Sequence, residues 1–221
     1  MADDQSNELF MRMVDMSGNP ILAECRTEVT TDGDDLIPDY FNGEFFAVDD
    51  FTFGLNIEDE DAAADAGTAG GAGKAKSSTA AVTAKTPKGK FAKWKSATPD
   101  EIKAMKFQLK MDDLSITRRY DRASPVLFQK CARSEPLQSA SLVKRKVVGS
   151  DMLQTFLRYD FKDVLVTRIS FQDADVLKET VQMVFRELFI QYRPQSPDGT
   201  LGAIRSVPWK FDAKTRTGPD R

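Results

Sequence analysis

Extended segments dominate the chain between Asp113 and Tyr192, and they restrict its fold more than any other feature. β-Branched and aromatic residues are frequent in this region, which is typical of β-strands. Within it we expect three strands, at Ala140–Val148, Thr155–Phe171 and Glu179–Tyr192. The sequence therefore predicts an all-β core.

The apolar residues of the third strand change parity along its length. Alternate residues are apolar from Val181 to Phe185, so a pleated strand points them to one face. After Arg186 the other parity is apolar, from Leu188 to Tyr192. Such a flip predicts a β-bulge, or a strand buried on both faces, as a closed or sharply curved sheet requires.

One helix is expected among these strands. Ser124 is the predicted N-cap of a helix over Ser124–Ser134, with Pro125 as its first residue. The pairs Leu127 with Cys131 and Phe128 with Ala132 should be buried. Further strands are predicted at Leu9–Val14, Ile21–Val29, Phe45–Leu55, Met105–Lys110 and Val207–Phe211, and a single helical turn at Thr98–Glu101.

The composition argues against an enzyme. The chain has no histidine, which removes the commonest general base and the commonest metal ligand. Its two cysteines, Cys25 and Cys131, are far apart and suggest buried thiols in a reducing compartment. Gly70–Lys74 lacks the first glycine and the final Ser or Thr of a phosphate-binding loop. We expect no catalytic, cofactor or metal site.

No apolar run approaches the roughly 18–20 residues that a membrane span requires. The first eight residues are acidic and lack the features of a signal peptide. We therefore expect a protein that is made and folded in the cytoplasm.

Charge is distributed very unevenly along the chain. Through Ala66 there are 18 Asp and Glu residues but only 2 Lys and Arg residues, whereas the remainder holds 16 and 29 respectively. The net charge of −3 therefore conceals an acidic first part and a basic second part. This asymmetry predicts oppositely charged surfaces, or a region that binds something acidic.

We expect one domain over residues 1–221, interrupted by a long insertion at about 57–104 and ending in a frayed tail at 214–221. Ala62–Ala84 is of low complexity and holds almost nothing that a core could bury. Loops of this length within compact domains tend to be functional or disordered.

Beyond the low-complexity stretch, cations alternate with aromatic residues, a pattern typical of proteins that bind single-stranded nucleic acids. The interpretation that we favour is docking of this loop on an acidic surface of another copy. Lys144–Lys146 is expected to be solvated or to form an ion pair between subunits. The candidate loop residues are Lys74, Lys85, Lys88, Lys90, Phe91, Lys93, Trp94 and Lys95, and the candidate acidic surface is Asp32, Asp34, Asp35, Glu58, Asp59, Glu60 and Asp61.

Several motifs, in order and spacing, resemble the Hcp family, the haemolysin-coregulated proteins of bacterial type VI secretion systems. The similar region runs from about residue 107 to 211. The motifs are Asp113–Thr117, Asp121–Pro125, Val143–Lys146, Phe161–Val166, Glu179–Val181, Tyr192–Gln195 and Trp209–Phe211.

The resemblance implies a compact β-barrel of two curved antiparallel sheets with one short helix, related to phage tail-tube proteins. It also implies a homo-hexameric ring that stacks into a tube, with the loop after the early strands helping one ring to stack on the next. The implied partners are a spike protein at the tip, a contractile sheath and effector cargo in the lumen. Assembly would be cytoplasmic, followed by export without a signal peptide.

The acidic stretch Thr30–Gly43 and the insertion at 57–104 are longer than in the usual family pattern. One alternative is a tail-tube protein of a phage-like contractile particle. Another is a monomeric nucleic-acid-binding β-barrel that uses residues 85–95. An enzyme is the weakest alternative, because no converging set of carboxylates or lysines is visible in the sequence.

Overall fold

The protein is described by a computed structural model, over residues 8–25, 34, 36–37, 43–58, 97–100, 108–148, 152–173, 175–196 and 199–210. The strands are β1 (Glu8–Asp15), β2 (Phe45–Ala47), β3 (Asp50–Thr52), β4 (Leu55–Glu58), β5 (Gln108–Met111), β6 (Leu114–Arg119), β7 (Leu137–Val148), β8 (Met152–Gln172), β9 (Lys178–Val184), β10 (Glu187–Tyr192) and β11 (Arg205–Lys210). A nine-residue helix, α4, spans Ser124–Ala132.

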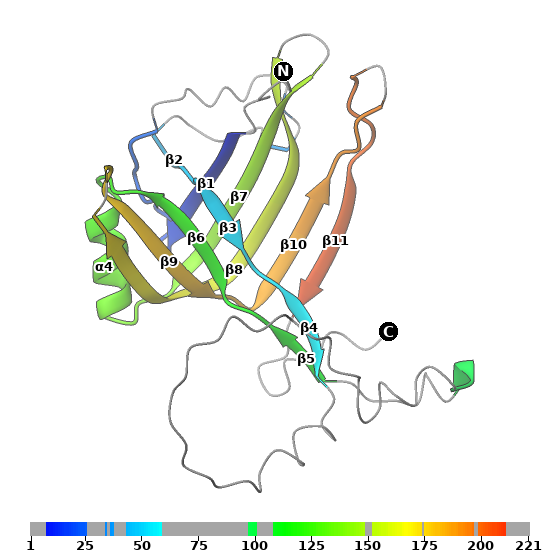
Figure 1. The fold of residues 1–221 in the computed structure, drawn as a ribbon, viewed down its shortest axis with the longest axis horizontal. Helices are drawn as coiled ribbons and strands as arrows, with labels where there is room; N and C mark the ends of the chain where they lie inside the picture. Colours follow the sequence, from blue (N-terminus) through cyan, green and yellow to red (C-terminus); the bar gives the residue numbers. More distant parts are fainter. Residues whose placement is uncertain are drawn as a thin grey trace, which may run out of the picture.

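Nine of these strands form one antiparallel sheet (Figure 1). Its main path runs β2-β1-β7-β8-β9-β6-β3, and β10 and β11 branch from β8. The predicted all-β fold with one short helix is confirmed. The two sheets that were predicted are joined into one continuous sheet, because β8 forms part of both.

β8 holds the two halves together and is 21 residues long. Its first part, residues 152–164, pairs with β7 and also borders β10. Its second part, residues 165–172, pairs with β9. Close to the junction of the two parts, Asp163 has a φ of 51°, a left-handed conformation that Asp tolerates better than most residues. The buried residues accordingly change parity, from Phe161 before the bend to Val164 after it.

The two end strands of the path, β2 and β3, follow each other in the chain. Only Val48 and Asp49 separate them. The N–H of Val48 donates to the carbonyl of Leu9 in β1 at 2.9 Å, and the N–H of Asp49 donates to the carbonyl of Thr117 in β6 at 2.8 Å. This short link crosses from one end of the path to the other, so the sheet curves back on itself.

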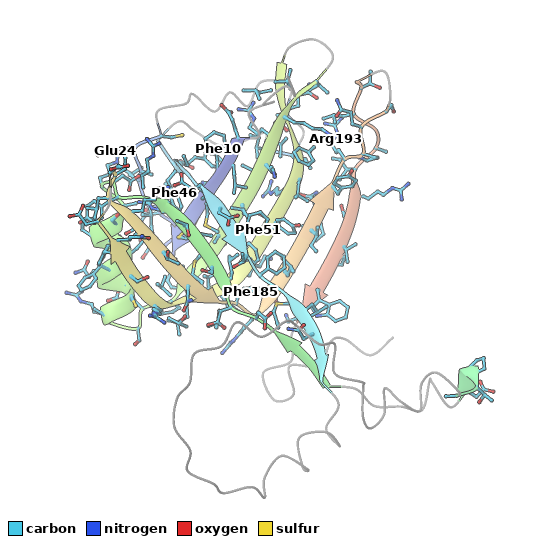
Figure 2. All side chains as sticks on the ribbon, in the orientation of Figure 1. Phe10, Glu24, Phe46, Phe51, Phe185 and Arg193 are labelled. Atoms are coloured by element: carbon cyan, nitrogen blue, oxygen red, sulfur yellow. The ribbon has the colours of Figure 1, made fainter. Side chains whose placement is uncertain are left out.

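The main core fills the concave side of the curved sheet. Phe161 is fully buried, and its ring centroid lies 4.7 Å from that of Phe185 and 6.0 Å from that of Phe53. Figure 2 labels Phe46, Phe51 and Phe185, whose rings reach the same interior from three different segments. Such edge-to-face aromatic packing adds to the stabilisation that burial gives.

A smaller core lies on the opposite face of β1, β2 and β7. It consists of Phe10, Ile37, Phe45 and Val143. Ile37 comes from the short segment that covers this part of the sheet, so both faces of β1 and β7 are buried there. The double burial agrees with the apolar residues found on both parities of these strands.

The predicted third strand, Glu179–Tyr192, is wrong as a single element. It is two strands, β9 and β10, interrupted at Phe185 and Arg186. The parity flip therefore marks a break, after which the chain pairs with a different part of β8. The backbone N–H of Arg186 donates to the carbonyl of Lys162 at 3.0 Å and holds the break beside the bend of β8.

Two other predicted strands differ from the structure. Phe45–Leu55 is divided into β2, β3 and the start of β4, because the chain leaves one pairing partner for the next every few residues. Residues 21–25, expected as the beginning of a strand over Ile21–Val29, form no strand. Their backbone is held instead by single hydrogen bonds, from Ile21 to Met13 and from Ala23 to Gly43, each 2.9 Å long.

The helix begins where predicted but is capped differently. Its N-cap is Ala123, with no side-chain cap, and it ends at Ala132 rather than Ser134. Leu127 is fully buried, whereas Phe128, predicted to be buried against Ala132, is 54% exposed. The Ser124 side chain is engaged elsewhere, as described below.

The extent of the insertion at 57–104, the tail at 214–221 and the single-domain organisation stay predictions. Of the helical turn expected at Thr98–Glu101, Pro99 and Asp100 are helical, and Glu101 lies outside the described residues.

Replacing Phe161 by Ala should lower the free energy of unfolding by about 3–5 kcal/mol, because it opens a cavity in the aromatic core. Urea denaturation of the purified variant measures this loss. Leu22, which is 53% exposed, is the control, and Leu22→Ala should change stability by less than about 0.5 kcal/mol. Equal effects of the two substitutions would contradict this placement of the core.

Candidate assembly surface

A two-stranded arm leaves the main sheet. β4 and β5 pair only with each other, in the register Leu55 with Met111 through Glu58 with Gln108, and they form a ladder separate from the nine-stranded sheet. Figure 1 shows this arm projecting from the rest of the sheet. Because an isolated two-stranded ladder is marginally stable in water, such an arm gains from contact with a partner.

The base of the arm is held by a compact polar contact. The N–H of Asp112 donates to the carbonyl of Gly54 at 2.9 Å. The Asn56 amide donates to both carboxylate oxygens of Asp112, at 3.1 and 3.2 Å. A Cβ at Gly54 would lie 2.6 Å from Asp112 Oδ2, so a larger residue there would push the Asp112 carboxylate out of its present position. These contacts set the direction in which the arm leaves the sheet.

Most of the candidate site residues lie outside the described part of the chain, so their roles stay predictions. Glu58 pairs through its backbone with Gln108 in the arm, and the role of its side chain also stays a prediction. The candidates outside the described residues are Lys74, Lys85, Lys88, Lys90, Phe91, Lys93, Trp94 and Lys95 of the loop, and Asp32, Asp35, Asp59, Glu60 and Asp61 of the acidic surface.

Asp34 has a different role from the acidic docking surface expected of it. It is 4% exposed, and its carboxylate accepts the N–H of Thr155 in β8 at 2.9 Å and that of Leu36 at 3.2 Å. Arg158 also donates to the carbonyl of Leu36. These bonds hold the segment around Leu36 against the sheet, so the charge of Asp34 is used within its own subunit.

The basic triplet Lys144–Lys146 is not the solvated face that was expected. Arg145 is 1% exposed, and its Nη2 donates to the carbonyl of Leu153 at 2.7 Å. The Lys146 ammonium lies 4.5 Å from the ring centroid of Phe156, and burial lowers the pKa of Lys146. A register shift beside Arg145 in the pairing of β7 with β8 accompanies this arrangement.

A buried ionic network that the sequence did not predict lies at the start of α4. Arg118, in β6, and Glu179, in β9, are fully buried, and Arg118 Nε lies 2.7 Å from Glu179 Oε1. The Arg118 guanidinium also stacks 4.1 Å from the ring centroid of Phe46 and pairs with Asp121. A buried charge needs such partners, because its desolvation is costly.

Ser124 completes the network, which explains why its side chain does not cap α4. Its hydroxyl accepts from Arg118 Nη2 at 3.1 Å and donates to Glu179 Oε1 at 2.9 Å. The carboxylate of Asp121 accepts the N–H of Ala123 at 2.8 Å and that of Glu24 at 3.1 Å. The network therefore joins β6, β9, the start of α4 and the segment after β1.

Opposing effects act on the pKa of the Glu179 carboxyl. Burial raises the pKa of its carboxyl, and the charge of Arg118 and the Ser124 hydroxyl work against that rise. Among the described residues, its Oε2 has no hydrogen-bond partner. The charge of Arg118 therefore offsets the cost of burying the Glu179 carboxylate.

A groove of about 580 Å³ lies on the side of β1, β7, β8, β10 and β11 opposite the main core. Four of the charged residues that line it form two ion pairs: Arg158 Nε lies 2.8 Å from Asp160 Oδ2, and Lys210 Nζ lies 2.5 Å from Glu187 Oε1. Ser141 Oγ donates to Asp160 at 2.6 Å. Charges that are paired in this way suit a binding or packing face better than acid–base chemistry.

Within the described ranges, no three His, Cys, Asp or Glu residues lie close enough to hold a metal ion. The same part of the chain contains no helix of the length and apolarity needed to cross a membrane.

The chain is similar in sequence and in fold to known proteins of type VI secretion systems. Residues 92–192 match a family model described as "Type VI secretion system effector, Hcp". The Pseudomonas aeruginosa protein hcp1 is 30% identical over 95 residues, which cover 42% of this chain and 58% of the relative. The chain thus matches less than two thirds of the length of that relative.

Solved structures share the fold at low sequence identity. One, described as a type six secretion system protein, aligns with a TM-score of 0.59 at 15% identity and covers 97% of this chain and 100% of its own. Hcp1 from Salmonella typhimurium aligns with a TM-score of 0.51 at 18% identity, covering 96% of this chain and 99% of its own.

Replacing Arg118 by Ala should lower the free energy of unfolding by about 3–5 kcal/mol, because it leaves the Glu179 carboxylate buried without its cation. The double variant Arg118→Met with Glu179→Leu is the control and should recover most of that loss, since it removes both charges together. Urea denaturation of Arg118→Met, Glu179→Leu and the double variant measures the coupling. Additive losses would contradict a direct ion pair.

The loss in Arg118→Ala should also depend on pH. Because burial raises the pKa of Glu179, folding favours its protonated form. Below the unfolded pKa of about 4.3 the carboxyl is neutral in both states and adds no penalty; the penalty grows as the pH rises through that value. The difference in stability from the unmodified protein should therefore be smaller near pH 4 than near pH 7, as urea denaturation at the two pH values would measure.

Proposed function

We propose that the chain is a member of the Hcp family and a structural subunit of the inner tube of a type VI secretion system. The observation that supports this most is that the family-matched segment, residues 92–192, contains β6 to β10, the central strands of the curved sheet. The Hcp family is one of structural tube proteins rather than enzymes.

Assembly is the mechanism of such a protein. In this proposal six copies form a ring, and rings stack into a hollow tube through the β4–β5 arm and the insertion that it carries. Contacts between two different surfaces repeat openly and so generate filaments. The arm supports the stacking role, because it projects from the sheet and its two strands pair only with each other.

Charge complementarity supports the same contact. The loop cations between Lys85 and Lys95 would meet acidic residues of the next ring, drawn from the first 66 residues, where acids greatly outnumber bases. Asp34 is excluded from that surface by its burial. Such contacts weaken as salt screens them.

The remaining partners follow from the tube. A spike protein would cap it, a contractile sheath would surround it, and effectors would travel in the lumen. The subunit would assemble in the cytoplasm and leave the cell with the tube.

Deleting residues 68–97 should leave a folded ring that no longer stacks into tubes, because the sheet and the base of the arm lie outside the deletion. Negative-stain imaging of the purified variant measures stacking, and circular dichroism checks the fold. Normal tubes from this variant would contradict the stacking role of the insertion.

A second variant keeps the length of the loop. Replacing its cations Lys85, Lys88, Lys90, Lys93 and Lys95 by Gln should weaken stacking and reduce its dependence on salt, because fewer loop cations are left to be screened. The same imaging, repeated over a series of salt concentrations, measures both effects. Stacking that keeps its full salt dependence would show that these cations are not the ones in contact.

A further inference from the structure

The groove of about 580 Å³ lies across adjacent strands of one subunit, β1, β7, β8, β10 and β11. Figure 1 shows β7, β8, β10 and β11 next to one another. Pockets that hold small organic molecules have volumes of about 300–1,000 Å³ and combine an apolar surface with a few placed polar groups. The strand register shows that this groove has the same combination.

A row of polar side chains crosses the groove. Ser139 on β7 lies opposite Lys162 on β8. Lys162 in turn lies opposite Glu187 on β10, and Glu187 lies opposite Lys210 on β11. Residues directly opposite each other on one face of an antiparallel pair have Cβ atoms about 4.5–5.5 Å apart. A group bound at Lys162 is therefore within reach of the Ser139 hydroxyl.

The apolar wall of the groove lies beside this row. Phe189 on β10 is opposite Pro208 on β11, and each is two residues along its strand from the polar row, hence on the same face. Phe189 is half-buried and Pro208 is exposed. The diagonal from Lys162 to Phe189 spans about 7–8 Å. One small molecule can therefore contact both the cation and the wall.

The acceptors of the groove are already engaged. The Asp160 carboxylate lies 2.8 Å from Arg158 Nε and accepts the Ser141 hydroxyl at 2.6 Å. The Glu187 carboxylate lies 2.5 Å from Lys210 Nζ. A cationic ligand would have to displace one of these partners, at the cost of leaving it unpaired.

Two donors of the groove, in contrast, are not engaged by any residue that the structure describes. The Lys162 ammonium forms no ion pair, and the Ser139 hydroxyl forms no hydrogen bond, with that part of the chain. The bond to Lys210 lowers the pKa of Glu187, and the charge of Lys162 adds to this effect, so Lys162 lies near an acid that is paired with another cation. Lys162 is also exposed, so it is accessible from solvent.

Unused donors and engaged acceptors favour a ligand that brings its own acceptors. The oxygens of a carboxylate or a phosphate can accept from an ammonium and a hydroxyl at the same time. The wall favours an apolar body attached to that head group, since burial of apolar surface adds to the affinity.

We infer that the groove binds a small amphiphilic acid. Its anionic head group accepts from Lys162 and Ser139, and its apolar body lies on Phe189 and Pro208. The inference goes beyond the proposed function and does not depend on it, because all of these residues belong to one subunit.

The test uses the full, unmodified chain and phenylbutyrate as the probe, in a saturation-transfer NMR titration. Phenylbutyrate should bind saturably. Phenylbutylamine, which has the same body and a cationic head, should bind at least tenfold more weakly, and acetate, which has no apolar body, should not displace phenylbutyrate at equal concentration. Phenyl phosphate is titrated in parallel, and the tighter of the two acids identifies the head group as a carboxylate or a phosphate.

Two variants locate the site. Lys162→Gln should weaken phenylbutyrate binding about tenfold, because it removes a charge-assisted hydrogen bond. Phe189→Ala should weaken it several-fold, because it removes the wall. Lys178→Gln is the matched control: Lys178 is a partly exposed lysine on β9, paired with Asp49 at 2.8 Å, and this variant should bind as the unmodified protein does. Circular dichroism checks that each variant is folded.

Two results would overturn the inference outright. One is the absence of saturable binding of both phenylbutyrate and phenyl phosphate, and the other is equal binding of phenylbutylamine. Full affinity in folded Lys162→Gln would place the acid elsewhere on the protein and would overturn this site. Ring formation is measured separately as a mass, so failure of this site leaves the tube proposal standing, and absence of rings leaves this site standing.

Discussion

The bend of β8 at Asp163 determines how the two halves of the sheet meet. Before the bend the strand pairs with β7 and β10, and after it with β9. One strand thus serves both halves, and the change of direction lets them enclose the aromatic core around Phe161. The break at Arg186 follows from it, because the segment that pairs with β8 must bend beside it.

Buried polar groups hold the elements that surround this core. The Arg118 network fixes the start of α4 against β6 and β9, and Asp34 fixes the segment over the second core against β8. Both hold segments of the chain against its own sheet. A tube subunit has to hold its contact surfaces in fixed positions, because an error in angle is repeated with every copy added.

Strand periodicity predicted the all-β fold and the positions of β7 and β8 well, since long apolar alternation is a strong local signal. Ser124 and Pro125 marked the start of α4, although the cap itself was wrong. The break between β9 and β10 was visible only as a parity flip, which a bulge produces equally well. The roles of Arg118 and Asp34 were not predictable, because their partners Glu179 and Thr155 are distant in the sequence. The loop candidates from Lys74 to Lys95 remain predictions.

The most direct test of the tube proposal uses the purified, unmodified protein at low and at high salt. Negative-stain imaging shows whether it forms rings, and light scattering measures their mass. We expect six-fold rings that stack more readily at low salt, where charge attraction is least screened. A single monomeric species at every salt concentration would contradict the tube proposal.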